Sequence, residues 1–216
     1  MKKVTPIILL LALAACSRKP VDVVPVGESF LPLAVGNTWI FQAEGHEDAV
    51  VPTPARLDTL SVTGKAVVQN VEFFRLEGTW PGFSNGGLWV FRAPNGNVYT
   101  AKAPHVGGSP FLIFDAEVGQ RWPLDEPVHG CLNSLALLDD YAVVNTPAGR
   151  FDGAREIGGG WIDCTNFGWT ASFARGVGPV RWETILFARS TNWVLIDAHI
   201  HDDFSGTLSN GSVSGD

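Results

Sequence analysis

Cysteine, methionine and tyrosine are scarce in this chain, and long apolar runs and helical periodicity are missing. Among 216 residues there are three cysteines, one methionine and two tyrosines. No apolar stretch reaches the roughly 20 residues that a transmembrane helix needs. No window places apolar residues at i, i+3, i+4 and i+7 between helix caps, so we do not expect helices to build the fold. The His-Glu-x-x-His and phosphate-loop motifs are also absent.

Basic residues are few as well. The chain has 15 Lys and Arg against 22 Asp and Glu, a net charge of −7. This balance argues against nucleic acid as a partner and against electrostatic adhesion to anionic lipid. What the chain does contain is ordinary apolar content (45%), eight tryptophans, thirteen phenylalanines, 24 glycines and 14 prolines. That composition supplies the core of one domain and many turns.

Residues 1–15 have the pattern of a cleaved secretory signal. Lys2 and Lys3 precede a short apolar run from Val4 to Leu13, which ends in small residues. The segment Leu13-Ala14-Ala15-Cys16 resembles the lipobox of bacterial lipoproteins. The resemblance implies cleavage before Cys16, attachment of diacylglycerol to its thiol, and anchoring to a membrane by the acyl chains. Ser17 follows in place of the Asp of the enteric inner-membrane sorting rule, which favours the outer membrane.

The two other cysteines, Cys131 and Cys164, form an even pair in an oxidising compartment. A disulfide is the economical interpretation, closing a loop of about 33 residues. Two free buried thiols remain an alternative. A metal ion bound by the two cysteines is another alternative, with His129 as the single candidate for an additional ligand.

The chain divides into a signal (1–15), a lipidated N-terminus and tether (16–29), one all-β domain (30–204) and a flexible tail (205–216). Short runs of strand-forming residues recur about every ten residues, separated by Gly, Pro and Asn, which predicts an antiparallel all-β domain. A curved meander closing toward a barrel and a two-sheet sandwich both fit. Residues 132–141 (LNSLALLDDY) form the only plausible short helix. We expect strands at 38–42, 57–62, 67–80 (straight or bent), 87–92, 97–101, 111–115, 141–145, 154–157, 161–165, 167–174, 179–188 and 193–200.

Three segments occur in the order found in a family of uncharacterised bacterial surface and periplasmic lipoproteins. The segment from Phe30 to Gln42 resembles the family's F-P-L-x-x-G-N-x-W opening, 145–152 (NTPAGRFD) its P-A-G-x-F segment, and 173–181 (FARGVGPVR) its A-x-G-V-G-x-V hairpin. The resemblance implies an all-β fold and brings no established activity. Each segment also has an architectural interpretation, since Trp39 and Phe41 share a strand face and Gly176 and Gly178 suit a bend.

The best candidate for chemistry is Asp197-x-His199-x-His201. On a regular strand these three side chains project to one face, about 6.6 Å apart pairwise. Such a set can hold zinc or a similar cation. Val194, Ile196, Ala198 and Ile200 then face the core, which makes the row equally compatible with an exposed polar face.

A second candidate is the segment 80–87 (WPGFSNGG). We expect a flexible loop that presents aromatic residues, with Trp80, Phe83 and Trp89 as candidate contacts. The other tryptophans are expected in the core or at its rim, with their indole N–H groups bonded to backbone.

These observations predict a lipid-anchored protein of the cell envelope with a non-enzymatic binding or structural role and no cofactor. Its partner would be a protein, a glycan or an apolar ligand. The alternatives are a metal-dependent hydrolase built on Asp197, His199 and His201, and a carrier that encloses a hydrophobic molecule.

Overall fold

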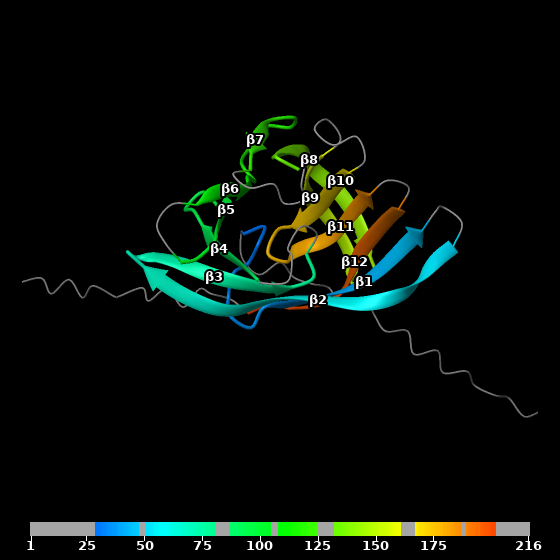
Figure 1. The fold of residues 1–216 in the computed structure, drawn as a ribbon, viewed down its shortest axis with the longest axis horizontal. Coiled ribbons are helices and arrows are strands. Elements are labelled where there is room, and N and C mark those ends of the chain that lie inside the picture. The colour runs from blue at the N-terminus through cyan, green and yellow to red at the C-terminus, as the bar shows by residue number, and fades with distance from the viewer. Residues whose placement is uncertain are drawn as a thin grey trace, which may run out of the picture.

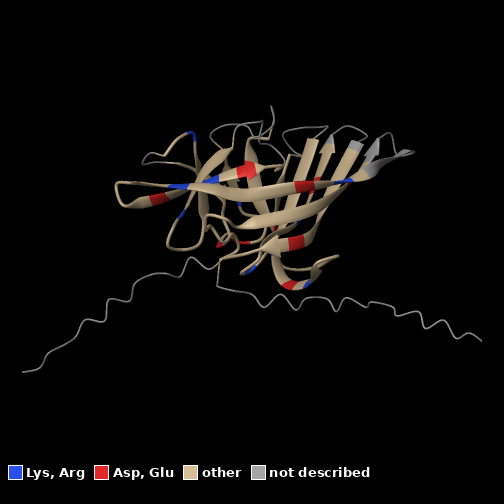
Figure 2. Ribbon diagram, turned by 90° about the horizontal axis from the view of Figure 1, so that it is seen from below, with Lys and Arg blue, Asp and Glu red and all other residues tan. Residues whose placement is uncertain are grey.

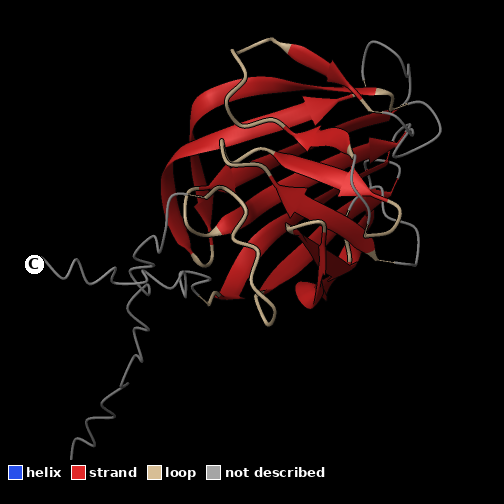
Figure 3. Ribbon diagram, turned by 90° about the vertical axis from the view of Figure 1, so that its left-hand side faces the viewer, coloured by secondary structure: helices blue, strands red, loops and turns tan. Residues whose placement is uncertain are grey.

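The computed structural model describes residues 29–47, 51–80, 87–104, 108–124, 132–160, 167–186 and 189–201. Within these residues the chain forms strands and turns without a helix (Figure 3). No helix there is long and apolar enough to cross a membrane. The strands are β1 (Thr38–Glu47), β2 (Val51–Val68), β3 (Val71–Gly78), β4 (Leu88–Arg92), β5 (Val98–Ala101), β6 (Ser109–Leu112), β7 (Arg121–Pro123), β8 (Ser134–Thr146), β9 (Gly149–Gly159), β10 (Phe167–Ala174), β11 (Gly178–Leu186) and β12 (Arg189–His199).

The described strands form one antiparallel sheet in the order β6-β5-β4-β3-β2-β1-β12-β11-β10-β9-β8-β7. Nearly every pair joins strands that follow each other in the chain, and the exception is β1 with β12. The sheet curls into a nearly closed, barrel-like shape that stays open between β6 and β7 (Figure 1). The all-β prediction is confirmed, in the form of the barrel-like meander rather than the sandwich.

Two predicted elements are wrong. Residues 132–141 do not form a helix, because Ser134 begins β8, which pairs with β9 along most of its length. An isolated helix of ten residues is marginal in water, so strand pairing outweighs the local pattern. Residues 67–80 are not one strand, because Gln69 and Asn70 take positive φ angles of 50° and 64° and turn the chain back so that Val68 pairs with Val71. Positive φ at both central residues is the mark of the tight type I′ hairpin.

Aromatic side chains fill the interior of the sheet. The Trp182 ring centroid lies 4.0 Å from that of Phe41, 5.8 Å from Trp80 and 5.6 Å from Trp193. These four residues belong to one continuous core that includes side chains from the strands on both sides of the opening. The core is therefore shared by both halves of the chain, as expected for a single domain.

One end of the sheet is closed by residues 29–35, which we term the N-terminal plug. Phe30, Leu31 and Leu33 are buried, and the Ser29 carbonyl accepts a hydrogen bond from the Gly176 amide at 2.7 Å. Asn37, fully buried, donates from Nδ2 to the Pro32 carbonyl and accepts from the His201 amide. Both ends of the described chain are thus held at this end of the sheet.

Two of the three sequence segments that resemble a lipoprotein family are in contact at this end, and the third is bonded to β12. The Trp39 indole donates to the Val177 carbonyl at 2.6 Å, and Gly178 lies so close to that indole that a Cβ would come within 2.8 Å of Nε1. The Ala148 amide donates to the Leu195 carbonyl on β12 at 3.1 Å. These contacts are consistent with an architectural role for the three segments.

The opening between β6 and β7 is bridged by side chains. The Trp122 indole on β7 donates to the Phe111 carbonyl on β6 at 3.0 Å. Nearby, Asn97 accepts the Phe114 amide at 2.8 Å and donates to the Asp115 carboxylate at 2.6 Å. The Trp122 bond links the two open sides, whereas the Asn97 bonds tie the segment after β6 to the start of β5. The described strands β6 and β7 do not pair through their backbones.

Candidate functional site

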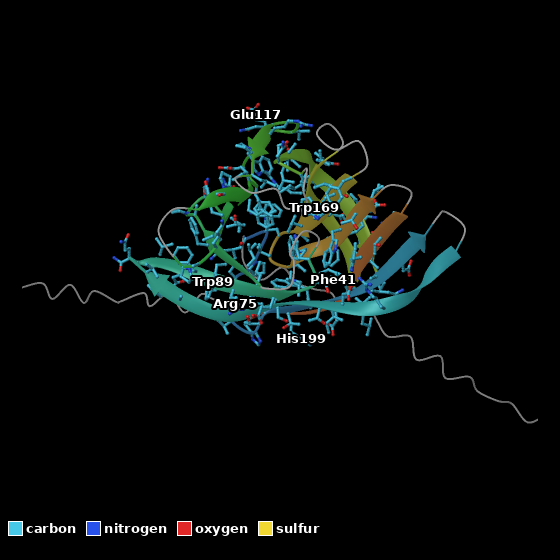
Figure 4. All side chains as sticks on the ribbon, viewed as in Figure 1. Phe41, Arg75, Trp89, Glu117, Trp169 and His199 are labelled. Carbon is cyan, nitrogen blue, oxygen red and sulfur yellow. The ribbon has the colours of Figure 1, made fainter. Side chains whose placement is uncertain are left out.

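Asp197 and His199 lie on the outer face of β12, as the sequence predicts. Their side chains are 59% and 63% exposed, and His199 Nε2 stands 3.7 Å from Asp197 Oδ2. In Figure 4 His199 points away from the interior of the sheet. The alternation predicted for the rest of β12 is wrong, however. A β-bulge places Ile40 opposite Asp197 and Phe41 opposite Leu195, so Ile196 is skipped.

The bulge at Ile196 changes which side chains of β12 face the core. Before it Trp193 and Leu195 are buried, and after it Ala198 and Ile200 pack against the core. Val194, predicted as a core residue, therefore lies on the outer face. An inserted residue reverses the two-residue alternation, which the sequence pattern alone does not reveal.

His201 does not join the other two side chains in a metal site. It lies beyond the end of β12, with its backbone amide bonded to Asn37 and its ring near Gly36. Within the described residues no three His, Cys, Asp or Glu side chains are placed to hold a metal ion. The hydrolase alternative therefore has no assembled site in this part of the chain.

Trp80 is not an exposed contact residue. It is 3% exposed and its ring lies among Phe111, Phe173 and Trp182 at centroid distances of 6.2, 5.8 and 5.8 Å. The expectation failed because Trp80 follows directly on β3 and is drawn into the aromatic core. Phe83, the second predicted contact, lies outside the described residues.

Trp89, the third predicted contact, lies on the outside of the sheet with a group of other aromatic residues. Phe73 is fully buried but does not belong to the interior core, whereas its neighbour Phe74 does. Phe73 therefore packs on the opposite face, where its centroid lies 5.2 Å from that of Phe91. Phe91 in turn stacks on Tyr99 at 5.2 Å with 15° between the ring planes.

Trp89 precedes Phe91 by two residues on β4 and shares its face. Trp89, Phe91 and Tyr99 are each half-buried, and Phe73 lies beneath them. We term these four residues the outer aromatic face. Sequence reasoning found only Trp89, although the two-residue spacing of Trp89 and Phe91 was a signal that pointed to the others.

A charged pair borders the outer aromatic face. Arg75 pairs across the strands with Trp89, and its Nε lies 2.8 Å from Glu77 Oε1. Figure 4 places Arg75 and Trp89 at the same side of the molecule, on β3 and β4. Gly108 lies directly over Phe91, since a Cβ there would come within 2.6 Å of the ring. The face thus combines apolar rings with one donor and one acceptor group on rigid strands.

Unlike the half-buried rings of the outer aromatic face, the tryptophans inside the described sheet are buried. Trp39 and Trp122 bond to backbone carbonyls as predicted, and Trp193 bonds instead to the Asp58 carboxylate at 2.7 Å. Trp169 and Trp182 are buried, and Nε1 of each has no hydrogen-bond partner among the described residues. The described core side chains are at most 9% exposed and pack in one continuous cluster.

Acidic and basic positions are interspersed along the described strands in the view of Figure 2. The exposed Arg150 guanidinium donates to Asp152, and this carboxylate raises the pKa of Arg150. Exposed ion pairs of this kind contribute little to the stability of a protein.

The cysteine predictions fall outside the described residues. Cys16, Cys131 and Cys164 all lie in segments of which the structure gives no account. Lipidation of Cys16 and a Cys131–Cys164 disulfide therefore stay predictions.

Comparison with known proteins finds similar solved structures but no similar family or curated protein. No protein-family model matches the chain, and no curated protein matches it. One similar solved structure is a Bacteroides fragilis protein described as a "putative exported protein with YmcC-like fold" (13% identity, TM-score 0.46), with 80% of this chain and 99% of that chain covered. Another is a "putative lipoprotein" from Parabacteroides distasonis (13% identity, TM-score 0.41), with 81% and 100% covered.

Proposed function

We propose that this chain is a lipid-anchored binding protein of the bacterial cell envelope and that its outer aromatic face binds a carbohydrate. The lipobox-like segment ending at Cys16 supports the anchor and the compartment, and Ser17 favours the outer membrane. The observation that carries the binding role is the group of half-buried rings on the outside of β4 and β5, with the buried Phe73 of β3 packed against Phe91.

A sugar ring suits this surface for chemical reasons. Its C–H face packs on an aromatic ring, and its hydroxyl groups require a donor and an acceptor beside that ring. Trp89 supplies the ring, while Arg75 and Glu77 stand next to it as donor and acceptor. Because the rings sit on paired strands, little conformational entropy is lost when a ligand binds.

The binding role is tested by measuring affinity for arrayed glycans and then for the best hit in solution. Trp89→Ala is expected to weaken binding about tenfold, since the loss of one aromatic contact costs on the order of 1.4 kcal/mol. Tyr141→Ala is the matched control, because Tyr141 is an exposed aromatic residue on β8. Equal affinity of wild type and Trp89→Ala would contradict the proposal.

The anchor is tested separately. Cys16→Ala is expected to move the protein from the membrane fraction to the soluble fraction, and the wild-type mature protein should carry the mass of its acyl chains. A membrane-bound Cys16→Ala variant would rule out the anchor without bearing on the aromatic face.

A further inference from the structure

Among the described strands, one stretch of β8 has a strand paired on one side only. β8 pairs with β9 as far as Thr146, but on its other side β7 covers only residues Ser134 to Ala136. Leu137 is then held by Gly119 and Gln120, through bonds of 2.7 and 3.3 Å. Beyond it, no described strand pairs on this side with residues 138–145, which we term the β8 edge.

The other free strands are protected against pairing. β6 has four residues, contains Pro110, and has its Phe111 carbonyl bonded to the Trp122 indole. β7 has three residues and ends in Pro123. Short strands, prolines and occupied carbonyls are the usual means by which proteins prevent unwanted strand addition. The β8 edge is longer and carries no proline.

The side chains of the β8 edge also point to a partner. Leu138, Tyr141 and Val143 are 43%, 72% and 47% exposed, which makes this the part of the described surface where large exposed hydrophobic residues lie closest together in the chain. Between them stand Asp139 and Asp140, both exposed. Among the described residues Asp140 has no ion-pair partner, and Asp139 accepts a hydrogen bond from the Tyr141 amide at 2.8 Å.

We infer that the β8 edge docks a short, extended peptide segment of another protein, rich in alternating basic and apolar residues. Added-strand binding satisfies backbone groups at the edge, and apolar contacts with alternate side chains give specificity. Lysine or arginine in the segment would pair with Asp139 and Asp140. The three register shifts between Leu137 and Val144 bend the strand, so they restrict the segment to a few residues.

The same charges argue against a second copy of this chain as the occupant. Two β8 edges paired antiparallel would bring their Asp139 and Asp140 side chains close together. Like charges opposite each other on neighbouring strands destabilise the pairing. A basic segment would instead be attracted to these aspartates. Charge complementarity therefore favours a basic segment over a second copy of this chain as the occupant.

The test uses the full-length lipidated protein in detergent micelles and a fluorescein-labelled peptide of alternating lysine and valine. Fluorescence polarisation is expected to show at least tenfold tighter binding of this peptide than of an alternating glutamate–valine peptide. Asp139→Lys/Asp140→Lys should weaken binding of the lysine–valine peptide at least tenfold. Glu44→Lys/Glu72→Lys makes the same change in net charge at two exposed positions on β1 and β3 and should have little effect.

A second variant separates the apolar contacts from the charges. Tyr141→Ser/Val143→Ser keeps both aspartates and should also weaken binding, while Trp89→Ala should not. All substituted positions of the β8 edge are exposed, so circular dichroism should confirm unchanged folding. Equal binding of the two peptides, or an equal loss in the Glu44/Glu72 control, would overturn the inference. So would a dimer in light scattering that Tyr141→Ser/Val143→Ser dissociates.

Discussion

Replacing Gly178 with alanine brings a methyl group into the indole of Trp39. The new Cβ would lie 2.8 Å from Nε1 and 3.0 Å from Cε2, closer than unbonded atoms approach. Gly178 also has a φ of +101°, which costs a residue with a side chain about 1–3 kcal/mol. We therefore expect Gly178→Ala to destabilise the protein by about 2–4 kcal/mol.

The cause of that loss can be separated by a double-mutant cycle. Trp39→Phe removes the donor to the Val177 carbonyl and the Cζ2 atom, which also lies 3.0 Å from the position of the added methyl group. Alone it should cost about 2–4 kcal/mol, from the unsatisfied carbonyl and the space left behind. Because the phenyl ring is no longer tied to Val177, it can move away from the added methyl group. The double variant should therefore be more stable than the sum of the single changes by about 1–2 kcal/mol.

Equilibrium urea unfolding followed by circular dichroism measures each free energy. A Cys16→Ser background removes the lipid acceptor, so unfolding can be followed without a membrane. Additivity within about 0.5 kcal/mol would refute the steric reasoning. It would mean that backbone strain at Gly178, and not contact with the indole, makes glycine necessary there.

Two further predictions concern the remaining tryptophans and cysteines. Trp122→Phe should cost about 1–3 kcal/mol more than Trp169→Phe in urea unfolding, because it leaves the Phe111 carbonyl without its donor, whereas the buried Trp169 indole has no hydrogen bond to lose among the described residues. Equal losses would show that the indole bond does not stabilise the opening. Reduction of a Cys131–Cys164 disulfide should cost about 3–4 kcal/mol, and thiol titration before and after denaturation should find no free thiol in the oxidised protein.

The fold class could be predicted because the strand-forming runs and the turn residues adopt in the structure the local conformations that their sequences favour. Strand-forming runs separated by Gly, Pro and Asn predicted an antiparallel all-β domain, and the turn at Asn95 and Gly96 lies between the strands expected at 87–92 and 97–101. The turn at Gln69 and Asn70 was missed because glutamine rarely takes a positive φ. Only the pairing of Val68 with Val71 makes that conformation favourable.

The candidate site was predicted less well, because side-chain orientation depends on contacts between distant strands. The sequence places Trp80 at the start of a glycine-rich loop, yet it packs against Phe173 and Trp182 from the far part of the chain. The bulge at Ile196 arises from pairing with β1 and reverses the alternation. Phe73 and Phe74 are neighbours in the chain and are both buried, on opposite faces of the sheet. A strand with one buried and one exposed face would alternate apolar and polar residues, so that pattern does not predict this arrangement.

The pairing of β1 with β12 also has a consequence for how the chain folds. β1 to β6 and β7 to β12 are each a meander of successive hairpins, and hairpins between neighbouring strands form in microseconds. The joining of the first and last strands closes the longest loop in the molecule, so its entropic cost comes late. Each half can therefore form its hairpins separately, and the rate of folding should be governed by the meeting of Trp39 and Phe41 with β12, the last of the described strands.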